Sequence, residues 1–456
     1  MKISDNYKGK HILVLGLARS GMAAANLLHD LGANVIVNDA KELSDNPAAR
    51  QLQEKGLTVV TGGHPLDLLN DNIELIVKNP GIPYTNPILE KAIEKEIPII
   101  TEVELAYHVS ESEIIGITGT NGKTTTTSMI KAIFDVEEKN KALLAGNIGF
   151  PASEVIVEAT REQVLITELS SFQLVGTIEF RPNIAVITNL FEAHIDYHGT
   201  RDEYVKAKWH IQQNMTESDV LIFNGDQVEL LELVKTTKAT VLPFSVEKVV
   251  EDGCYLEDDY LIFKGEKIMR QKELGVPGIH NIQNALAAIA VCKIYGVSNE
   301  SIKTGLTHFS GVPHRTEFIG EYNGVKVYND SKATNILATK RALSGFDNEH
   351  VVLIAGGLDR GNYFEELEPS LEGLKSIIIL GEAKDKMATS ARHVGVTNII
   401  LVNTMAEAVE KALEQVKSED VLLLSPACAS WDMYPDFETR GDDFVAEINK
   451  QVGKDK

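Results

Sequence analysis

Short runs rich in isoleucine, valine and leucine alternate with helix-like stretches along most of this 456-residue chain. This alternation is typical of α/β folds, in which helices cover both faces of largely parallel sheets. We therefore predict an α/β protein. The predicted strands cover residues 12–15, 35–38, 75–78, 114–118, 164–168, 184–188, 220–223, 325–328, 351–355, 377–380, 399–402 and 421–424.

The strand pattern restarts twice, and each restart follows a segment marked by proline. The first follows Ile97-Pro98-Ile99-Ile100-Thr101. The second follows Ser310-Gly311-Val312-Pro313, where glycine and proline together favour a turn or hinge. We predict three domains, over residues 1–101, 102–311 and 312–456. Turn residues between 240 and 275 predict a small antiparallel appendage on the middle domain.

Charge and apolar content bear on the partners of the chain. Its 44 basic and 66 acidic side chains give a formal net charge of -22, which repels nucleic-acid backbones and anionic membrane surfaces. The longest apolar candidate, residues 285–291, is too short to span a bilayer and is expected to be a buried helix. We expect no nucleic-acid or membrane partner, no signal peptide before the first strand, and three buried, unpaired cysteines in a reducing cytoplasm.

A first glycine-containing loop follows the first predicted strand. Gly16-Leu17-Ala18-Arg19-Ser20-Gly21 leads into a helical stretch, and Asp39 ends the next strand. This order is close to a dinucleotide-binding fingerprint, but Ala18 replaces the middle glycine. A diphosphate ligand is one interpretation, and an NAD-dependent dehydrogenase or a plain strand-to-helix turn is the alternative.

A second glycine-rich loop, Gly119-Thr120-Asn121-Gly122-Lys123-Thr124, follows an apolar strand and opens a threonine-rich helix. Backbone N–H groups in such a loop cradle a polyphosphate, Lys123 reaches the terminal phosphates, and Thr124 supplies an oxygen to magnesium. Ile117 stands where a strict P-loop has glycine, so this is a variant of the motif. A GTP switch is disfavoured because no Asn-Lys-x-Asp or Thr-Lys-x-Asp segment is present.

Acidic and histidine residues follow the neighbouring predicted strands. Glu168 ends a strand, where a carboxylate suits magnesium; a solvated strand end is the alternative. His194 and His198 have a spacing that could suit zinc, but Gly199 favours a loop there and phosphate-linked magnesium is the stronger interpretation. A hydrogen-bonded structural histidine remains the other possibility for His194.

Several ordered segments across the whole chain resemble the Mur ligases. Besides the loop at 119–124, they are residues 168–174 (ELSSFQL), 280–285 (HNIQNA), 314–317 (HRTE), 329–335 (NDSKATN), 425–432 (SPACASWD) and 437–441 (FETRG). The chain lacks the Asp-Asn-Pro-Arg segment expected of members that add diaminopimelate or lysine. The resemblance therefore favours the D-glutamate-adding branch.

The resemblance implies Rossmann-like first and last domains around a central P-loop domain. It also implies ATP-dependent addition of D-glutamate to UDP-N-acetylmuramoyl-L-alanine through an acyl phosphate, with ADP and phosphate as products. A cytoplasmic monomer that makes a peptidoglycan precursor is expected. A catalytically idle homologue that binds nucleotide is the alternative.

By the same resemblance, Lys123, Glu168, His194 and Lys208 are the catalytic residues. Two magnesium ions are expected, one on Thr124 and Glu168 and the other on His194 and a carbamylated Lys208; an unmodified, solvated Lys208 is the alternative.

The implied binding residues form three groups. The ATP group is Gly119, Thr120, Asn121, Gly122, Lys123, Thr124, Thr125, Asn284, Arg315 and Asp330. The UDP-substrate group is Leu17, Ala18, Arg19, Asp39, Gly81, Asn147 and His194. The D-glutamate group is Lys332, Thr334, Arg360, Ser430 and Phe437, with a surface-loop arginine as the other reading of Arg360.

Overall fold

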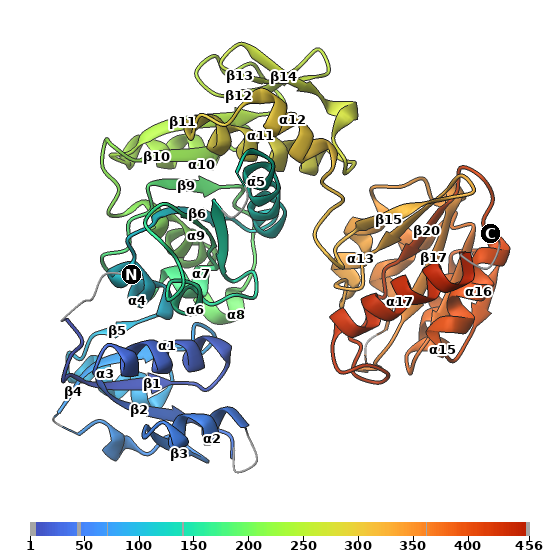
Figure 1. Cartoon of the computed structure of the whole chain (residues 1–456). Coiled ribbons are helices and arrows are strands. Elements are labelled where there is room, and N and C mark those ends of the chain that lie inside the picture. Colours follow the sequence, from blue (N-terminus) through green and yellow to red (C-terminus); the bar gives the residue numbers. More distant parts are fainter. Residues whose placement is uncertain (1–5, 43–46, 71, 139–140, 362, 453–456) are drawn as a thin grey trace. The chain divides into compact units, whose positions relative to one another are not determined.

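The computed structural model describes residues 6–42, 47–70, 72–138, 141–361 and 363–452. The chain forms two compact units (Figure 1). One contains Met1–Leu274 and Ile279–His308, and the other contains Gly275–Gly278 and Phe309–Lys456. The start of the chain, on which the signal-peptide expectation depends, lies partly outside the described residues. None of the described helices is long and apolar enough to cross a membrane.

The first sheet of the larger unit has five parallel strands in the order β3-β2-β1-β4-β5. Three of them were predicted, whereas β3 and β5 were missed. The strands are β1 (His11–Leu15), β2 (Asn34–Asp39), β3 (Thr58–Thr61), β4 (Ile73–Lys78) and β5 (Ile99–Ile100), and the helices are α1 (Arg19–Asp30), α2 (Pro47–Glu54) and α3 (Pro87–Glu94).

The second sheet has nine strands in the order β14-β13-β12-β11-β10-β9-β6-β8-β7. Its strands are β6 (Glu113–Thr118), β7 (Ala142–Gly146), β8 (Val164–Glu168), β9 (Ile184–Ile187), β10 (Val220–Asn224), β11 (Thr240–Ser245), β12 (Cys254–Glu257), β13 (Tyr260–Phe263) and β14 (Glu266–Arg270). Its helices are α4 (Glu102–Val109), α5 (Lys123–Glu137), α6 (Ala152–Val155), α7 (Ser171–Leu174), α8 (Ile195–His198), α9 (Arg201–Trp209), α10 (Val228–Leu233), α11 (Ile279–Ile294) and α12 (Asn299–Thr307).

Strands β12 to β14 pair antiparallel, as predicted for this region. They are not a separate appendage, because β12 pairs with β11 and so extends the edge of the parallel sheet. Helix α11 contains the predicted buried segment, and each residue from Ala285 to Val291 is fully buried. All three cysteines are buried and unpaired, as predicted.

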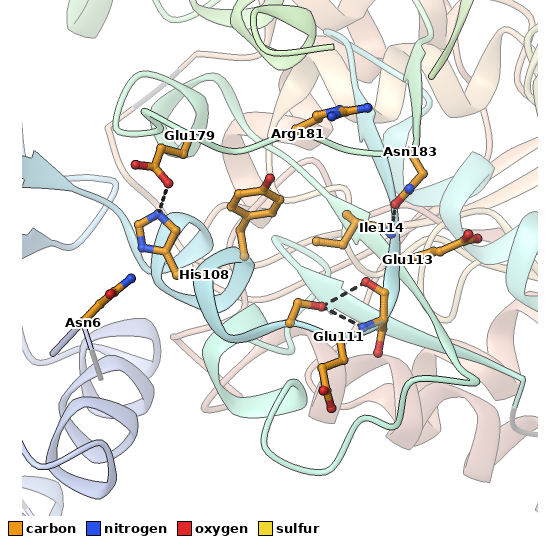
Figure 2. A pocket seen from close by; sticks show the side chains of 11 residues that line it. Asn6, His108, Glu111, Glu113, Ile114, Glu179, Arg181 and Asn183 are labelled. Carbon is orange, nitrogen blue, oxygen red and sulfur yellow. Dashed lines mark hydrogen bonds and ion pairs between the residues drawn. The ribbon is translucent and has the colours of Figure 1, made fainter. Parts of the chain in front are cut away.

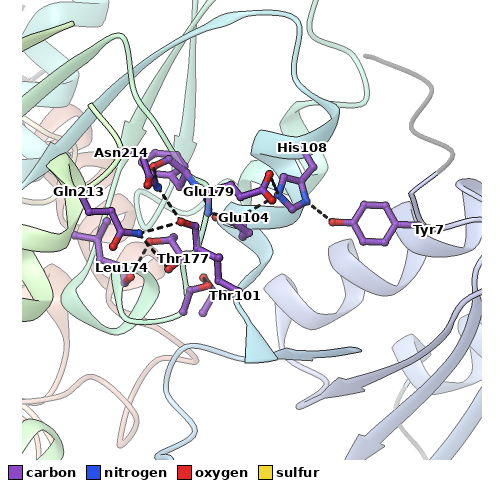
Figure 3. A network of polar contacts seen from close by, with 12 residues as sticks. Tyr7, Thr101, Glu104, His108, Leu174, Thr177, Glu179, Gln213 and Asn214 are labelled. Carbon is purple, nitrogen blue, oxygen red and sulfur yellow. Dashed lines mark hydrogen bonds and ion pairs between the residues drawn. The ribbon is translucent and has the colours of Figure 1, made fainter. Parts of the chain in front are cut away.

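Helix α4 joins the first sheet to the second through a polar network (Figure 3). The Tyr7 hydroxyl lies 2.5 Å from Nδ1 of His108, and Nε2 of His108 lies 3.2 Å from the buried carboxylate of Glu104. Glu104 also accepts hydrogen bonds from the backbone N–H groups of Glu179 and Phe180. A segment before β1 is thereby held against the central part of the chain.

The smaller unit contains a six-stranded sheet in the order β15-β16-β20-β17-β18-β19. Only β15, which was not predicted, pairs antiparallel within this sheet. Apolar clusters cover both faces. The strands are β15 (Glu317–Tyr322), β16 (Val325–Asn329), β17 (Val351–Gly356), β18 (Ser376–Leu380), β19 (Ile399–Leu401) and β20 (Val421–Leu424), and the helices are α13 (Ile336–Leu343), α14 (Glu368–Leu371), α15 (Lys384–His393), α16 (Met405–Gln415) and α17 (Phe437–Val452).

Candidate active site

The glycine-rich loop lies between the carboxyl end of β6 and the start of α5, as predicted. Gly119 has a φ of +143°, and a Cβ atom at that position would come within 2.0 Å of Oγ1 of Thr188. Gly122 has a φ of +82°, and a Cβ atom there would meet Oδ1 of Asn284 at 2.3 Å. Glycine is required at both positions because the backbone is left-handed and neighbouring side chains press on it.

Residues after β9 fix the loop. The backbone N–H groups of Thr120 and Asn121 donate to the carbonyl and side-chain oxygens of Asn189, both at 2.9 Å. The Thr188 hydroxyl donates to the Asn121 carbonyl oxygen at 2.6 Å. Since these two N–H groups are used inside the protein, the N–H groups that the site offers an anion are those of the first turn of α5.

Lys123, the first residue of α5, folds back over the loop. Its ammonium donates to the carbonyl oxygens of Gly119 at 2.9 Å and Thr120 at 3.0 Å. The side chain of Asn284, from α11, lies over Gly122 and accepts a hydrogen bond from the Thr126 hydroxyl at 3.3 Å. A positive charge is therefore kept at the loop, where it can meet phosphate oxygens.

Glu168 lies beside this loop because β8 pairs with β6 and places Glu168 opposite Ile117. The side chain is buried, with 2% exposure. Its Oε1 accepts a hydrogen bond from the Asn147 amide at 2.9 Å, but its Oε2 has no hydrogen-bond partner in the described structure. A buried carboxylate oxygen without a partner is costly, and a cation offsets that cost. The Glu168 carboxylate and the hydroxyl of the buried Thr124 together offer the oxygen ligands that magnesium prefers.

Lys208, from α9, is buried against the same loop, with 2% exposure. Its ammonium donates to the Gly119 carbonyl oxygen at 2.7 Å and lies 4.8 Å from the centre of the Tyr204 ring. Burial, and then the neighbouring charge of Lys123, lower the pKa of Lys208 well below its usual value, whereas Glu168 acts in the opposite direction. The predicted alternative of a solvated lysine is therefore wrong.

His194 is the N-cap of α8 and has a left-handed backbone with φ of +55°. The Phe172 ring lies 5.0 Å from the His194 ring in an edge-to-face contact. Burial, followed by the charge of Lys208, lowers the pKa of His194. The neutral form, which can bind a metal through nitrogen, is therefore favoured.

The loop predicted around His194 and His198 is wrong, because residues 195–198 form one turn of helix. A zinc site at His194 and His198 was already the weaker of the two interpretations. The described part of the chain contains no cluster of three or more histidine, cysteine, aspartate or glutamate side chains that could hold a metal ion.

Around the first sheet, the predicted UDP-side residues lie on the loops after β1 and β4, at the start of α1 and at the end of β2. Asp39 accepts hydrogen bonds from the backbone N–H groups of Leu17 at 2.7 Å and Lys41 at 3.0 Å, so it holds the loop after β1. Ala18 is the N-cap of α1, and the exposed Arg19 pairs with Glu154 of α6 at 3.0 Å. Gly81 lies in the loop after β4, where its N–H donates to the Asn79 side chain at 3.1 Å.

The remaining predicted ATP residues, Arg315 and Asp330, belong to the smaller unit. Arg315 is exposed, whereas Asp330 is buried after β16. One carboxylate oxygen of Asp330 accepts from the Thr316 N–H at 3.0 Å, and the other accepts from the Ser425 hydroxyl at 2.7 Å. Burial raises the pKa of Asp330 to about 6. Asp330 thus organises the loop that carries Arg315.

The predicted D-glutamate residues lie on loops of the smaller unit and on the start of α17. The Lys332 ammonium is 5.1 Å from the Phe437 ring, and the Arg360 guanidinium is 4.8 Å from the ring of the exposed Trp431. Ser430 is buried, and its carbonyl oxygen accepts from the N–H of Tyr434 at 2.8 Å. Thr334 is half-buried two residues after Lys332.

The comparisons with known proteins agree with this geometry. Residues 10–101 match the Mur ligase MurD-like N-terminal domain, residues 117–292 the Mur ligase middle domain, and residues 314–428 the Mur ligase glutamate ligase domain. A protein of Enterococcus faecalis named UDP-N-acetylmuramoylalanine-D-glutamate ligase is 58% identical over 451 residues, which cover 99% of both chains. The chain belongs to the Mur ligase family.

This Mur ligase is also 56% identical over 447 residues to the Enterococcus hirae protein of the same name, covering 98% of this chain and 97% of that one. The crystal structure of a UDP-N-acetylmuramate-alanine ligase from Thermotoga maritima is 21% identical, covers 97% of this chain and 99% of its own, and has a TM-score of 0.59. The latter likeness concerns the fold. The predicted α/β class, with Rossmann-like outer domains and a central nucleotide-binding domain, is confirmed.

Three side chains that hold the site of this Mur ligase were not predicted to contribute. Asn189 fixes the loop amides, Tyr204 donates from its hydroxyl to Oγ1 of Thr120 at 3.0 Å, and Phe172 packs on His194. Tyr204 and Lys208 are four residues apart on one helix and so share a face, which is a signal the sequence contains. The role of Asn189 depends on the order of the strands in the sheet, and a short stretch of sequence does not predict that order.

A cavity of about 500 Å³ lies at the other end of the central strands of this Mur ligase (Figure 2). His108, Glu111, Glu179 and Arg181 are among its lining residues, and it reaches the amino ends of β6 and β9. The glycine-rich loop follows the carboxyl end of β6. This cavity is therefore separate from the candidate active site.

Proposed function

We propose that this Mur ligase adds D-glutamate to UDP-N-acetylmuramoyl-L-alanine, using ATP and giving ADP and phosphate, in the synthesis of a peptidoglycan precursor. The observation that carries the proposal is the 58% identity over 99% of both chains to a protein named for this activity. The glycine-rich loop beside a buried carboxylate, the half-buried Lys123 and the buried Lys208 is the kind of site that phosphoryl transfer to a carboxylate requires.

The first step brings two anions together, the ATP γ-phosphate and the alanyl carboxylate. We assign Lys123 to the phosphates, because its ammonium is already held at the loop by two carbonyl oxygens. The first turn of α5 supplies N–H groups to the same anion. Asn284, Arg315 and Asp330 are assigned to ATP, together with the loop residues Gly119 to Thr125.

Magnesium binding is assigned to two sets of side chains. Thr124 and Glu168 form the first set, supported by the Oε2 atom of Glu168 that has no protein partner in the described structure. His194 and a carbamylated Lys208 form the second set. A lowered lysine pKa favours the neutral amine, which is the form that reacts with carbon dioxide. Magnesium supplies charge neutralisation during phosphoryl transfer.

Substrate binding is assigned to two groups of residues. Leu17, Ala18, Arg19, Asp39 and Gly81 are assigned to the UDP end, with Asn147 and His194 toward the reacting end. Lys332, Thr334, Arg360, Ser430 and Phe437 are assigned to D-glutamate.

The domain division at residues 1–101, 102–311 and 312–456 is part of the proposal. So are a monomeric state, a cytoplasmic location, and the absence of nucleic-acid and membrane partners.

Phosphate release from ATP, measured with UDP-N-acetylmuramoyl-L-alanine, tests the function. D-glutamate is expected to support release, whereas L-glutamate and L-lysine are not. Release that does not depend on D-glutamate contradicts the substrate assignment. Nicotinamide binding, measured by fluorescence, is the outcome expected of a dehydrogenase, and nucleotide binding without turnover is that of an idle homologue.

A further inference from the structure

Lys78 is a buried cation that the proposed reaction does not use. It is the last residue of β4, and its side chain is only 1% exposed. No ion pair joins it to a carboxylate in the part of the chain that the structure describes. Burial lowers the pKa of Lys78 to about 8. A buried charge without a counter-charge must be compensated by hydrogen bonds.

The ammonium of Lys78 obtains those bonds from the loop that follows β4. It donates to the carbonyl oxygens of Pro80 at 3.0 Å and Ile82 at 2.9 Å, and lies 3.4 Å from that of Asn79. The Tyr84 ring centre is 4.9 Å away, so the cation also faces an aromatic surface. One side chain therefore gathers three carbonyl groups around Gly81.

The same ammonium reaches the central part of the chain. It lies 3.2 Å from the hydroxyl of Tyr197, and this hydroxyl in turn donates to the Pro80 carbonyl oxygen at 3.2 Å. Tyr197 belongs to α8, the single helical turn whose N-cap is His194. The Phe172 ring packs on both Tyr197, at 4.5 Å, and His194, at 5.0 Å.

The loop after β4 also contacts the loop after β1 and the start of α1. The Asn79 amide donates to the Ser20 hydroxyl at 3.0 Å, and a Cβ atom on Gly16 would come within 2.8 Å of Cβ of Asn79. The position of the backbone around Gly81 is thus linked to the loop that carries Leu17 and Ala18, which are also assigned to the UDP end.

We propose that Lys78 is a positioning residue for the UDP substrate, because it ties the loop carrying Gly81 to the helical turn that begins at His194. This inference rests on the proposed function. The contacts of Lys78 are to the loop after β4 and to Tyr197, so we assign it to positioning and not to the chemical step. Lys78 sets the distance between the loop that carries Gly81, which we assign to the UDP end of the substrate, and His194, which we assign to the reacting end.

The test compares three single variants. Lys78→Met keeps the length of the side chain but removes the charge, and Tyr197→Phe removes only the hydroxyl. Lys91→Met is a control at a lysine on α3 that pairs with Glu94 at 3.0 Å. We expect Lys78→Met to raise KM for UDP-N-acetylmuramoyl-L-alanine about tenfold or more, as expected for lost hydrogen bonds to a charged group. KM for ATP and for D-glutamate should stay within about twofold.

Tyr197→Phe should give a smaller rise of the same kind, and Lys91→Met none. The double variant Lys78→Met/Tyr197→Phe should fall short of the product of the single effects, because both changes break one network. Thermal unfolding of each variant shows whether the fold is kept. A purely structural lysine would change all three KM values together or none of them, and either pattern overturns the inference.

Calorimetric titration with UDP-N-acetylmuramoyl-L-alanine in the absence of ATP separates this inference from the proposed function. Weaker binding by Lys78→Met than by the wild-type protein supports the positioning role even if no D-glutamate-dependent turnover is found. Equal binding by the two proteins overturns the positioning role of Lys78. It does not affect the proposed ligase activity, which phosphate release tests separately. If Lys78→Met does not fold, Tyr197→Phe decides, and an unchanged KM for the UDP substrate in that variant counts against the role.

Discussion

The ammonium of Lys208 donates a hydrogen bond to the carbonyl oxygen of Gly119 at 2.7 Å, which joins α9 to the first residue of the glycine-rich loop. This contact is compatible with a carbamate, because a carbamylated nitrogen keeps one N–H group. Lys208 can thus hold the loop through nitrogen and offer anionic oxygens to a cation.

Lys208→Ala is predicted to lower ATP-dependent phosphate release about 100-fold or more, because it removes the proposed oxygen ligand and the contact to Gly119. Added short carboxylates such as formate or acetate are predicted to restore part of the activity by occupying the vacated space.

Lys206→Ala, on the exposed side of α9 where Lys206 pairs with Glu203, is the matched control and should keep normal activity. Full activity in Lys208→Ala would remove the carbamate from the proposal. A loss that no carboxylate rescues would favour the structural contact to Gly119 alone.

Glu168→Gln is predicted to abolish most of the activity while leaving the fold intact. The amide oxygen can still accept from Asn147, but the charge that we assign to magnesium is lost. We expect activity to fall about 100-fold or more and the magnesium concentration for half-maximal rate to rise.

Glu158→Gln, at an exposed position, is the control for the loss of one negative charge. The magnesium dependence of phosphate release and the thermal unfolding midpoint should be measured together. A variant that unfolds at a much lower temperature would place Glu168 in folding rather than in metal binding.

Gly122→Ala is predicted to destabilise the protein and to raise KM for ATP. The left-handed backbone costs an alanine about 1 to 2 kcal/mol, and the new Cβ would also press on Oδ1 of the buried Asn284 at 2.3 Å. Gly265→Ala is the matched control, because Gly265 has a φ of +81° and no atom within 4 Å of an added Cβ.

Chemical denaturation should show a larger loss of unfolding free energy for Gly122→Ala than for Gly265→Ala. Only Gly122→Ala should alter KM for ATP. Equal losses in the two variants would mean that Asn284 moves aside without cost.

The pair of His108 and Glu104 predicts a pH-dependent contribution to stability. The hydrogen bond with Glu104 is the main cause that raises the pKa of His108 above its usual 6.5, with Glu179 adding to it and burial opposing it. A raised histidine pKa stabilises the folded state fully below about pH 6.5, and this stabilisation is lost as pH rises through the folded pKa.

Thermal unfolding between about pH 6 and pH 8.5 should therefore show that the stability advantage of the wild-type protein over His108→Gln shrinks as pH increases. His29→Gln, at the exposed end of α1, controls for loss of a histidine. An advantage that stays constant with pH would mean that His108 contributes only as a neutral hydrogen-bonding group.

Strands with continuous apolar runs were predicted closely. The observed strand over Val164–Glu168 has the predicted bounds, and so does the one over Val421–Leu424. The missed strand β7 is regular and has five residues. Two other missed strands are short or irregular: β5 has two residues, and β15 contains Gly320 at an interruption of its register. In these elements, pairing with neighbours decides the conformation, because the local pattern is too weak to do so.

Corrections arose where distant segments meet. The turn at Ile195–His198 is helical, although Gly199 favoured a loop, and its N-cap His194 packs against Phe172. The strands from β12 to β14 extend the central sheet because β11 offers them a free edge. Neither outcome depends on the local sequence alone.

The sequence by itself determined the α/β class, the family and the loop from Gly119 to Thr124, because each depends on residues that are contiguous or regularly spaced. Only the tertiary structure decided that Lys208 contacts Gly119, that Asn284 lies over Gly122, and that Lys78 reaches Tyr197. These partners are separated by 89 and 119 positions in the hydrogen-bonded pairs. Such contacts follow from the order of strands in a sheet and from how helices cover it, which no local run of residues specifies.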